Sequence, residues 1–380
     1  MTLHVGLNAL HLVPGETGGG ETYVRRLVPA LLEASARLTL FAGEEAYPEL
    51  LAEAWAGEAT VVRVPVKARS RARRVAAEQA LLPRAGRRAR VDLLHNTLNT
   101  APAFPTIPQV TTIHDVIYKR FPETAGRLNM GVALLVPLAA RRSSVVLTDS
   151  DASKRDIVEF LGVEPSRVDV APLGPGIPEP DEPLAAAELR EQLGLGEAPI
   201  VLTVAAKRPH KNLDRLVDAV GRLATDAVLV IPGFETSFGP ELKRRAGERV
   251  RFLGWVDDRT LDGLYRAATC FVLPSLAEGF GLPVLEAMAR ATPVVCSDIG
   301  SLREVAGEAA LYFDALDPAA MALAIDRALG DSELRAGLRV AGLERSRRFT
   351  WEGAAEATLK TYDRVLAEPT GNASRLNPRT

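Results

Sequence analysis

Short apolar runs rich in valine, leucine and isoleucine recur along the chain and alternate with longer segments that mix apolar and charged residues. Within the runs apolar and polar positions do not alternate, so both faces of each predicted strand are apolar. Such strands are typical of parallel sheets that helices cover on both sides. Seven strands are predicted in the first half, at residues 3–10, 37–42, 59–66, 91–96, 109–115, 143–149 and 167–173. Helix-length segments separate most of them, which predicts a doubly wound α/β domain.

Glycine and proline interrupt the chain at residues 173–183 (LGPGIPEPDEP) too often for a helix or a strand, which indicates a linker. The alternation then resumes, with strands predicted at 198–206, 226–233, 249–255, 268–275, 292–298 and 309–314. A chain of 380 residues also exceeds the usual size of one hydrophobic core. We therefore predict two tandem domains, residues 1–175 and 176–349. Because ligands of such sheets bind outside the carboxyl ends of the strands, the facing domains would enclose a cleft.

Composition favours a soluble globular protein, with 47% hydrophobic and 25% charged residues. The formal net charge of −2 argues against a general nucleic-acid binder. The amino terminus lacks the features of a signal peptide, and no apolar run approaches the roughly 18 residues of a membrane span, so we expect a cytoplasmic protein. The longest candidate, residues 130–140, contains Pro137 and is predicted to be a buried helix.

The stretch SLAEGFGLPVLEAM, residues 275–288, places two carboxylates in otherwise apolar or glycine-rich sequence. The strand before it is predicted to end at Ser275, and a helix to begin near Leu282-Pro283. Glu278 then lies in the loop and Glu286 in the first turns of the helix. Free N–H groups at such a helix start favour phosphate, and the two glutamates would accept hydrogen bonds from nearby hydroxyls. The alternative is that both are ordinary acids favoured by the helix dipole.

The segment EGFGLPVLE matches the E-x7-E motif of retaining glycosyltransferases of family 4, which have the GT-B fold of two Rossmann-like domains. The resemblance covers nearly the whole chain, because further motifs occur in the family's order and spacing: GGGETYVRRL, TIHD, TDSDASKRDI, HKNLDRL, VRFLGWVDD, GSLREVAG and RFTWEGAA. Each motif alone is weak, but the ordered set is specific. Within the family, the chain looks most like mannosyltransferases that build O-antigen and related bacterial polysaccharides. A hydride-transfer enzyme is disfavoured, because neither domain has a G-x-G-x-x-G turn after its first strand.

The resemblance implies roles for individual residues. Glu278 would contact hydroxyls of the donor sugar, Glu286 the ribose of the nucleotide, and Lys211 the diphosphate. Further donor-binding residues implied in the same way are Gly279, Phe280, Gly281, Leu282, Gly254, Val256, Gly19 and Gly20. An arginine that many relatives place a few residues before the lysine falls on Ala206 here, and Lys207 or Arg208 would have to replace it.

Two segments of the first domain complete the expected site. Gly18, Gly19 and Gly20 stand before a helix predicted to begin near Glu21, and they let the backbone approach a ligand closely. In the family this loop closes over the diphosphate and the acceptor. His114 ends the strand at 109–115, and the matching family histidine lies near the donor sugar and β-phosphate. We therefore predict Glu278, Lys211 and His114 as catalytic residues.

The implied reaction transfers a hexose from a nucleotide-diphosphate sugar with retention at the anomeric carbon. No carboxylate stands out as a nucleophile, so attack from the face that the diphosphate leaves fits better than a double displacement. No Asp-x-Asp metal motif stands where a donor site would need one, and we expect neither a metal nor a cofactor. GDP-mannose is the favoured donor and a UDP-sugar the alternative. A GT-B sugar-nucleotide epimerase and a non-catalytic nucleotide-sugar-binding protein remain open.

Residues 63–90 carry ten basic side chains against one acid, Glu78, a local charge of +9. Arginines mixed with apolar residues at helical spacing are typical of helices that meet anionic lipid. This segment favours peripheral contact with the inner face of a membrane that carries a lipid-linked acceptor; a solvated basic face is the alternative.

The carboxyl end predicts a helix at 350–367, which in the GT-B fold packs back onto the first domain. Thr350 is its predicted N-cap. The predicted buried stripe consists of Trp351, Ala355, Leu359, Tyr362 and Leu366. Residues 371–380 are predicted to be loosely held.

Overall fold

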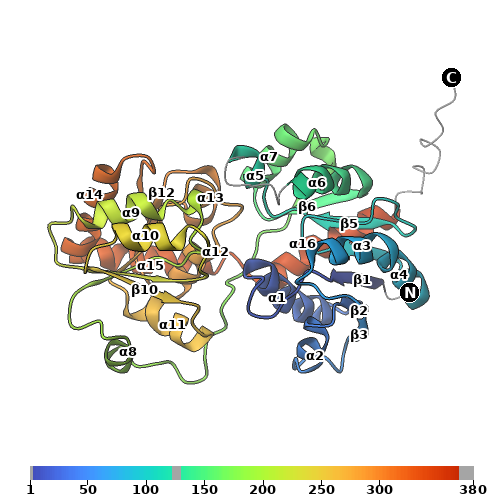
Figure 1. Ribbon diagram of the computed structural model, residues 1–380, viewed down its shortest axis with the longest axis horizontal. Coiled ribbons are helices and arrows are strands. Elements are labelled where there is room, and N and C mark those ends of the chain that lie inside the picture. Colours follow the sequence, from blue (N-terminus) through green and yellow to red (C-terminus); the bar gives the residue numbers. More distant parts are fainter. Residues whose placement is uncertain (1–2, 122–129, 368–380) are drawn as a thin grey trace.

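Two parallel β-sheets with helices on both faces form the two ends of the molecule (Figure 1). The structure, a computed structural model, describes residues 3–121 and 130–367. Each of the predicted strands contains one observed strand, and the predicted linker contains neither a helix nor a strand. The predicted α/β fold with two Rossmann-like sheets is confirmed.

The first sheet has the order β3-β2-β1-β4-β5-β6-β7, and all its strand pairs are parallel. Its strands are β1 (His4–Ala9), β2 (Arg37–Ala42), β3 (Thr60–Arg63), β4 (Leu93–Asn96), β5 (Gln109–Thr112), β6 (Val145–Thr148) and β7 (Val168–Val170). Because β1 lies between β2 and β4, the connections reverse direction there. Ligands of doubly wound sheets bind at such a switch point.

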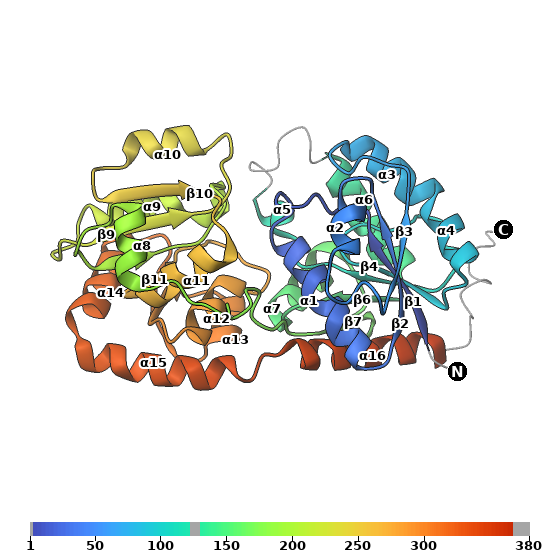
Figure 2. The ribbon, with the colours of Figure 1, turned by 90° about the horizontal axis from the view of Figure 1, so that it is seen from below.

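Helices cover the first sheet on both faces (Figure 2). One face carries α1 (Gly19–Glu33), α2 (Ala46–Leu51) and α16 (Trp351–Ala367); the other carries α3 (Arg71–Ala80), α4 (Leu82–Ala89), α6 (Met130–Arg142) and α7 (Asp151–Leu161), and the short α5 (Ile117–Arg120) follows β5. The prediction that residues 130–140 form a buried helix holds for one side only, because Leu134 is 70% exposed whereas Val136 is buried.

The helix after β1 begins earlier than predicted. The carbonyl of Gly18 accepts hydrogen bonds from the backbone N–H groups of Glu21 and Thr22, so Gly19 and Gly20 lie in the first turn of α1 and not in the loop. Gly18 can make this turn because its φ of +61° is readily adopted by glycine.

The second sheet has the order β10-β9-β8-β11-β12-β13, again with parallel pairs. Its strands are β8 (Ile200–Leu202), β9 (Val228–Pro232), β10 (Val250–Gly254), β11 (Cys270–Leu273), β12 (Val294–Ser297) and β13 (Ala310–Phe313). The helices on one face are α9 (Leu213–Val220), α10 (Gly239–Arg245) and α14 (Pro318–Gly330); those on the other are α8 (Ala186–Leu193), α11 (Asp258–Ala267), α12 (Leu282–Ala289) and α13 (Gly300–Ala306), with α15 (Ser332–Ser346) packed on α12.

The last helix, α16, extends along the first domain and packs against α1 and β6 (Figure 2). The hydroxyl of Thr350 accepts a hydrogen bond from the N–H of Gly353, as an N-cap does. The buried stripe differs from the prediction at its end, because Leu366 is 40% exposed and Val365 is buried instead. The buried face runs through Ala354, Thr358, Thr361 and Val365, so it is turned around the helix away from Leu366. The segment 371–380 lies outside the described residues.

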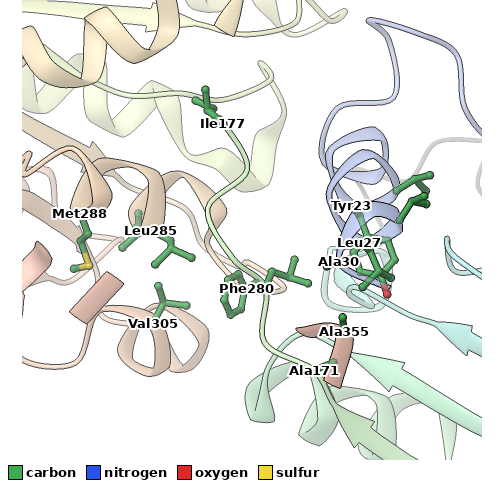
Figure 3. Packing of buried hydrophobic residues seen from close by; sticks show 14 of the residues in the cluster. Tyr23, Leu27, Ala30, Ala171, Ile177, Phe280, Leu285, Met288, Val305 and Ala355 are labelled. Carbon is green, nitrogen blue, oxygen red and sulfur yellow. The ribbon is translucent and has the colours of Figure 1, made fainter. Parts of the chain in front are cut away.

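The hydrophobic core continues from one domain into the other (Figure 3). Ala171 and Ile177, on the segment that joins the domains, belong to the same buried cluster as Leu27 of α1 and Leu285 of α12. The connection is therefore packed against both domains. Within the described ranges, no helix is both long and apolar enough to cross a bilayer.

Candidate active site

The loop between β11 and α12 turns into the helix at Gly281. Its φ of +112° is a backbone conformation that side-chain-bearing residues rarely adopt, and a Cβ there would lie 2.6 Å from Leu302. Pro283 occupies the first turn of α12, where its missing N–H leaves no donor unpaired. The local sequence thus fixes a helix start that points its free N–H groups out of the carboxyl edge of the second sheet.

Glu278 and Lys211 meet at this edge. The Nζ atom of Lys211 lies 2.7 Å from the Oε1 atom of Glu278, and the hydroxyl of Ser275 donates to the same oxygen at 2.6 Å. Both side chains are mostly buried, with exposed fractions of 18% for Lys211 and 9% for Glu278. The two loops are also tied by a backbone hydrogen bond from Leu276 to His210. The predicted sugar-binding carboxylate and the predicted diphosphate-binding lysine are therefore direct partners.

Glu286 lies deeper than Glu278, one turn into α12. It is 8% exposed, and its carboxylate accepts a hydrogen bond of 2.8 Å from the hydroxyl of Tyr265 on α11. Burial raises the pKa of Glu286 to about 7, although the Tyr265 hydroxyl and the nearby Arg290 act in the opposite direction. A carboxyl that titrates near neutral pH is typical of functional sites.

Glu286 also lies against the segment that joins the domains. A Cβ added at Gly176 would come within 2.6 Å of the Glu286 carboxylate, so a larger residue there would have to displace the Glu286 side chain. Arg26 of α1 donates to the carbonyl of Gly176, and Arg290, which directly follows α12, donates to the carbonyls of Ile177 and Pro178. The ribose-binding candidate is therefore next to the chain crossing between the domains.

His114 enters the same region from the first domain. Its Nδ1 atom lies 2.7 Å from the Oδ2 atom of Asp149, and its Nε2 atom lies 3.2 Å from the carbonyl oxygen of Thr97. The ring of Tyr23 packs edge-on against the imidazole, with 4.8 Å between ring centroids. Burial by itself would lower the pKa of His114, but the charge and hydrogen bond of Asp149 outweigh it, and the net shift is upward.

Gly279 joins the two halves of the site. Its carbonyl accepts hydrogen bonds from Ser150 at 2.6 Å and from Ser153 at 2.8 Å, both on the first domain. The backbone of Gly279 packs so closely on the carbonyl of His114 that any Cβ would overlap it. The loop that carries Glu278 is thus held directly against His114.

The other predicted donor-binding residues are placed differently. Phe280 turns into the core, where its ring packs edge-on against Phe349 at 5.8 Å, so a contact with the donor would have to come from its backbone. Gly254 is the last residue of β10, and Val256 lies two residues after it. The ring of Trp255, between them, stacks on the ring of Phe234 with 4.5 Å between centroids.

Burial distinguishes Lys207 from Arg208, the two candidates to replace the family arginine whose position falls on Ala206. The side chain of Lys207 is fully buried, donates to the carbonyl of Gly233 at 2.5 Å and lies 3.5 Å from Glu235. Arg208 is exposed. Of these two cationic side chains, it is therefore the one available to a ligand.

Comparisons with known proteins agree with this geometry. Residues 17–174 match the profile described as Glycosyltransferase Family 4, and residues 186–345 match that of Glycosyl transferases group 1. The O-antigen chain mannosyltransferase B of Escherichia coli is 32% identical over 266 residues, which cover 67% of this chain and 69% of that protein. This chain belongs to glycosyltransferase family 4. It is a glycosyltransferase of the GT-B type.

Other relatives of this glycosyltransferase have names that describe activities other than mannose transfer. The D-inositol 3-phosphate glycosyltransferase of Acidothermus cellulolyticus is 35% identical over 268 residues, 64% of this chain and 57% of that protein. Among solved structures, the sucrose-phosphate synthase of Thermosynechococcus elongatus superimposes with a TM-score of 0.77 at 23% identity, over 97% of this chain and 100% of that one. Anabaena HepE in complex with UDP and glucose has a TM-score of 0.75 at 21% identity, over 95% of this chain and 100% of that one. These structures share the fold.

Several residues of the glycosyltransferase site were not singled out from the sequence. Tyr265 donates to Glu286, and Ser275 donates to Glu278. In the sequence, the first lies in a predicted helix and the second at a predicted strand end, and neither pattern indicates these contacts. Asp149 and Ser150 lie in the motif TDSDASKRDI, so the motif marked the place but not the contacts. Among the described residues, no group of three or more His, Cys, Asp or Glu side chains is arranged to hold a metal ion.

Proposed function

We propose that this glycosyltransferase moves a hexose from a nucleotide-diphosphate sugar to a glycan or lipid-linked acceptor, with retention at the anomeric carbon. The favoured donor is GDP-mannose. The observation that carries the proposal is the contact between Lys211 and Glu278 at the N-terminus of α12, with Glu286 one turn further along. A cation, a helix start and two carboxylates are the groups that a diphosphate flanked by a sugar and a ribose requires.

The proposed chemistry follows from where charge develops. As the glycosidic bond loosens, negative charge grows on the diphosphate, and Lys211 with the N–H groups of α12 is positioned to stabilise it. Positive charge grows on the sugar ring, where the carboxylate of Glu278 would face it. In same-face attack, the acceptor oxygen bonds to the anomeric carbon while its proton passes to an oxygen of the leaving diphosphate. The proposal involves no metal and no cofactor.

The choice of mannose rests on the family resemblance and on the similarity to an O-antigen mannosyltransferase. A UDP-sugar is the second candidate, because Anabaena HepE has the same fold and was crystallised with UDP and with UDP-glucose.

The experiment is a transfer assay with labelled GDP-mannose and, separately, labelled UDP-glucose, each with and without a bacterial lipid extract as acceptor. We expect release of GDP and transfer of label to lipid only when GDP-mannose and the extract are both present. The anomeric configuration of the product, measured by NMR, tests retention. Conversion of either donor into an isomer without any acceptor would instead identify an epimerase. Release of UDP from UDP-glucose, with no release of GDP from GDP-mannose, would exclude the mannose assignment.

We also propose that the acceptor is reached at the inner face of a membrane. Among the ten basic residues at 63–90, Arg63 pairs with Glu44 and Arg69 pairs with Glu16 on the surface. The exposed basic side chains without an acidic partner among the described residues form what we call the basic face: Lys67, Arg73, Arg84, Arg87, Arg88 and Arg90.

The basic face has an apolar part. The exposed arginines of α4 recur at positions three and four apart and so share one side of the helix. An open groove of about 530 Å³ is lined by Lys67 and Arg73 of the basic face, by Glu44, and by apolar residues that include Val66, Ala76, Ala80 and Leu81. Exposed cations around apolar surface favour an anionic bilayer over a nucleic acid.

Sedimentation with vesicles tests this contact. At low salt we expect binding to phosphatidylglycerol vesicles and none to phosphatidylcholine vesicles. Replacing Arg84, Arg87 and Arg88 by Gln should remove binding, whereas Gln at the exposed Arg244, Arg339 and Arg347 of the second domain should not. No binding of the parent protein to the anionic vesicles would end the membrane proposal without touching the donor chemistry.

A further inference from the structure

Both ring nitrogens of His114 face acceptors. The carboxylate of Asp149 lies 2.7 Å from Nδ1, and the carbonyl oxygen of Thr97 lies 3.2 Å from Nε2. A carbonyl oxygen never donates a hydrogen bond, and an ionised carboxylate only accepts. A neutral imidazole has a single N–H, so it can satisfy just one of the two contacts. With an ionised carboxylate at Asp149, both are made together only by an imidazolium that carries a proton on each nitrogen.

The surroundings of the ring support that charge state. Asp149 follows β6 and is 4% exposed, and Asp115 adds a second carboxyl beside the ring. On the other side Tyr23 of α1 presents its ring edge-on, which brings no charge. Among the described residues, the other histidines near the ring are His11 and His95, whose pKa values burial lowers to about 3. His114 is thus the one cationic candidate among them.

We propose that Asp149 is a positioning residue that holds His114 as a doubly protonated imidazolium, which gives the donor site a fixed positive charge. The inference rests on the proposed function, because it assigns His114 to the leaving diphosphate. The carbonyl of His114 touches Gly279, next to Glu278 and its partner Lys211, so a histidine of the first domain and a lysine of the second approach the same loop. Preorganised positive charge of this kind stabilises a departing diphosphate.

The charge state also excludes a role. An imidazolium with both protons committed has no lone pair, so His114 does not take the proton of the acceptor hydroxyl. The proton must go to another group, and same-face attack sends it to the leaving diphosphate. His114 therefore acts through its charge and not as a base.

The direct test is ¹H–¹⁵N NMR of the imidazole rings in the donor-free protein, which does not depend on any transfer activity. The chain has five histidines, and the pKa values of His4, His11, His95 and His210 are all lowered. We expect one ring, assigned by its loss in His114→Gln, to stay doubly protonated to the highest pH. In Asp149→Asn its pKa should fall by about 1–3 units. Asp156→Asn, which removes the partner of Arg120 on the outside of α7, should leave it unchanged.

The donor reaction adds a second readout. Loss of donor turnover, measured as kcat/KM, should follow deprotonation of His114 as pH rises, and in Asp149→Asn the loss should move to lower pH. A His114 ring that carries one proton at pH 7 in the parent protein would overturn the proposal, whatever the enzyme transfers. So would an activity that rises with pH through the titration of His114, since that is the behaviour of a base.

Discussion

The ammonium of Lys211 lies 2.7 Å from the carboxylate of Glu278, although 67 positions separate the two residues in the chain. They meet because β8 and β11 are neighbours in the second sheet, so the loops after them share its carboxyl edge. In the donor-free protein each charge neutralises the other. A donor diphosphate would compete with Glu278 for the ammonium and leave the carboxylate to the sugar hydroxyls.

Replacing Glu278 by Gln keeps the shape and removes the charge. We expect kcat to fall by about tenfold or more, because the carboxylate would act most strongly when positive charge grows on the sugar ring. Affinity for the nucleoside diphosphate should change little. Steady-state rates and calorimetry measure the two quantities, and Glu344→Gln, at an exposed position of α15, is the control. Unchanged kcat in Glu278→Gln would remove this residue from the catalytic site.

Replacing Glu286 by Gln should weaken binding of the free diphosphate. A charge-assisted hydrogen bond to the ribose is worth about 1.5–3 kcal/mol, which corresponds to roughly ten- to a hundredfold in affinity. Calorimetry with the diphosphate tests this. If Glu286→Gln binds and turns over like the parent, the carboxylate serves only the contact with Tyr265.

The same substitution should change the pH dependence of stability. Burial raises the pKa of Glu286 to about 7 in the folded protein, above its usual value of 4.5, so the folded state holds the proton more tightly than the unfolded state. The stability that this proton contributes is complete below pH 4.5 and is lost as pH rises to about 7. Each unit of the shift corresponds to about 1.4 kcal/mol. Glu286→Gln should therefore gain in Tm over the parent at pH 8 and not at pH 4.5; equal differences at both pH values would contradict the assignment.

Gly281→Ala should distort the start of α12. The added Cβ would meet Leu302 and would occupy a backbone conformation with φ of +112°. We expect a loss of about 1–3 kcal/mol in the free energy of unfolding and weaker diphosphate binding. Gly337→Ala is a matched control, because that glycine lies in α15 with no heavy atom within 4 Å of the added Cβ. Chemical denaturation of both variants separates the strained site from an ordinary helical glycine.

The fold followed from the sequence because buried parallel strands leave a strong pattern. Every predicted strand is present, and all but β2 are shorter than predicted; residues such as Asp115 and Asp149 stand beyond strand ends and were included in the predicted runs. Errors arose where the pattern is weak. Leu366 was assigned to the buried face by its type, and the start of α1 was hidden by glycines that fit a loop or a first turn equally well.

Less of the candidate site than of the fold could be predicted from the sequence. Motif order predicted Glu278, Glu286 and Lys211 as site residues, and the structure brings Glu278 and Lys211 together. Contacts between distant segments are set by tertiary packing and leave no local pattern. Tyr265 reaches Glu286 from another helix, and Asp149 reaches His114 from another strand.

The central claim is that the cleft binds a nucleoside diphosphate through Lys211 and the N-terminus of α12. Isothermal titration calorimetry of the parent protein and of Lys211→Met with GDP, UDP and ADP tests it most directly. We predict that the parent binds one of these nucleotides, GDP in preference, and that Lys211→Met binds the same nucleotide at least about tenfold more weakly, since a charge-assisted hydrogen bond is lost. No binding of any of the three by the folded parent, or equal affinity in Lys211→Met, would contradict the account.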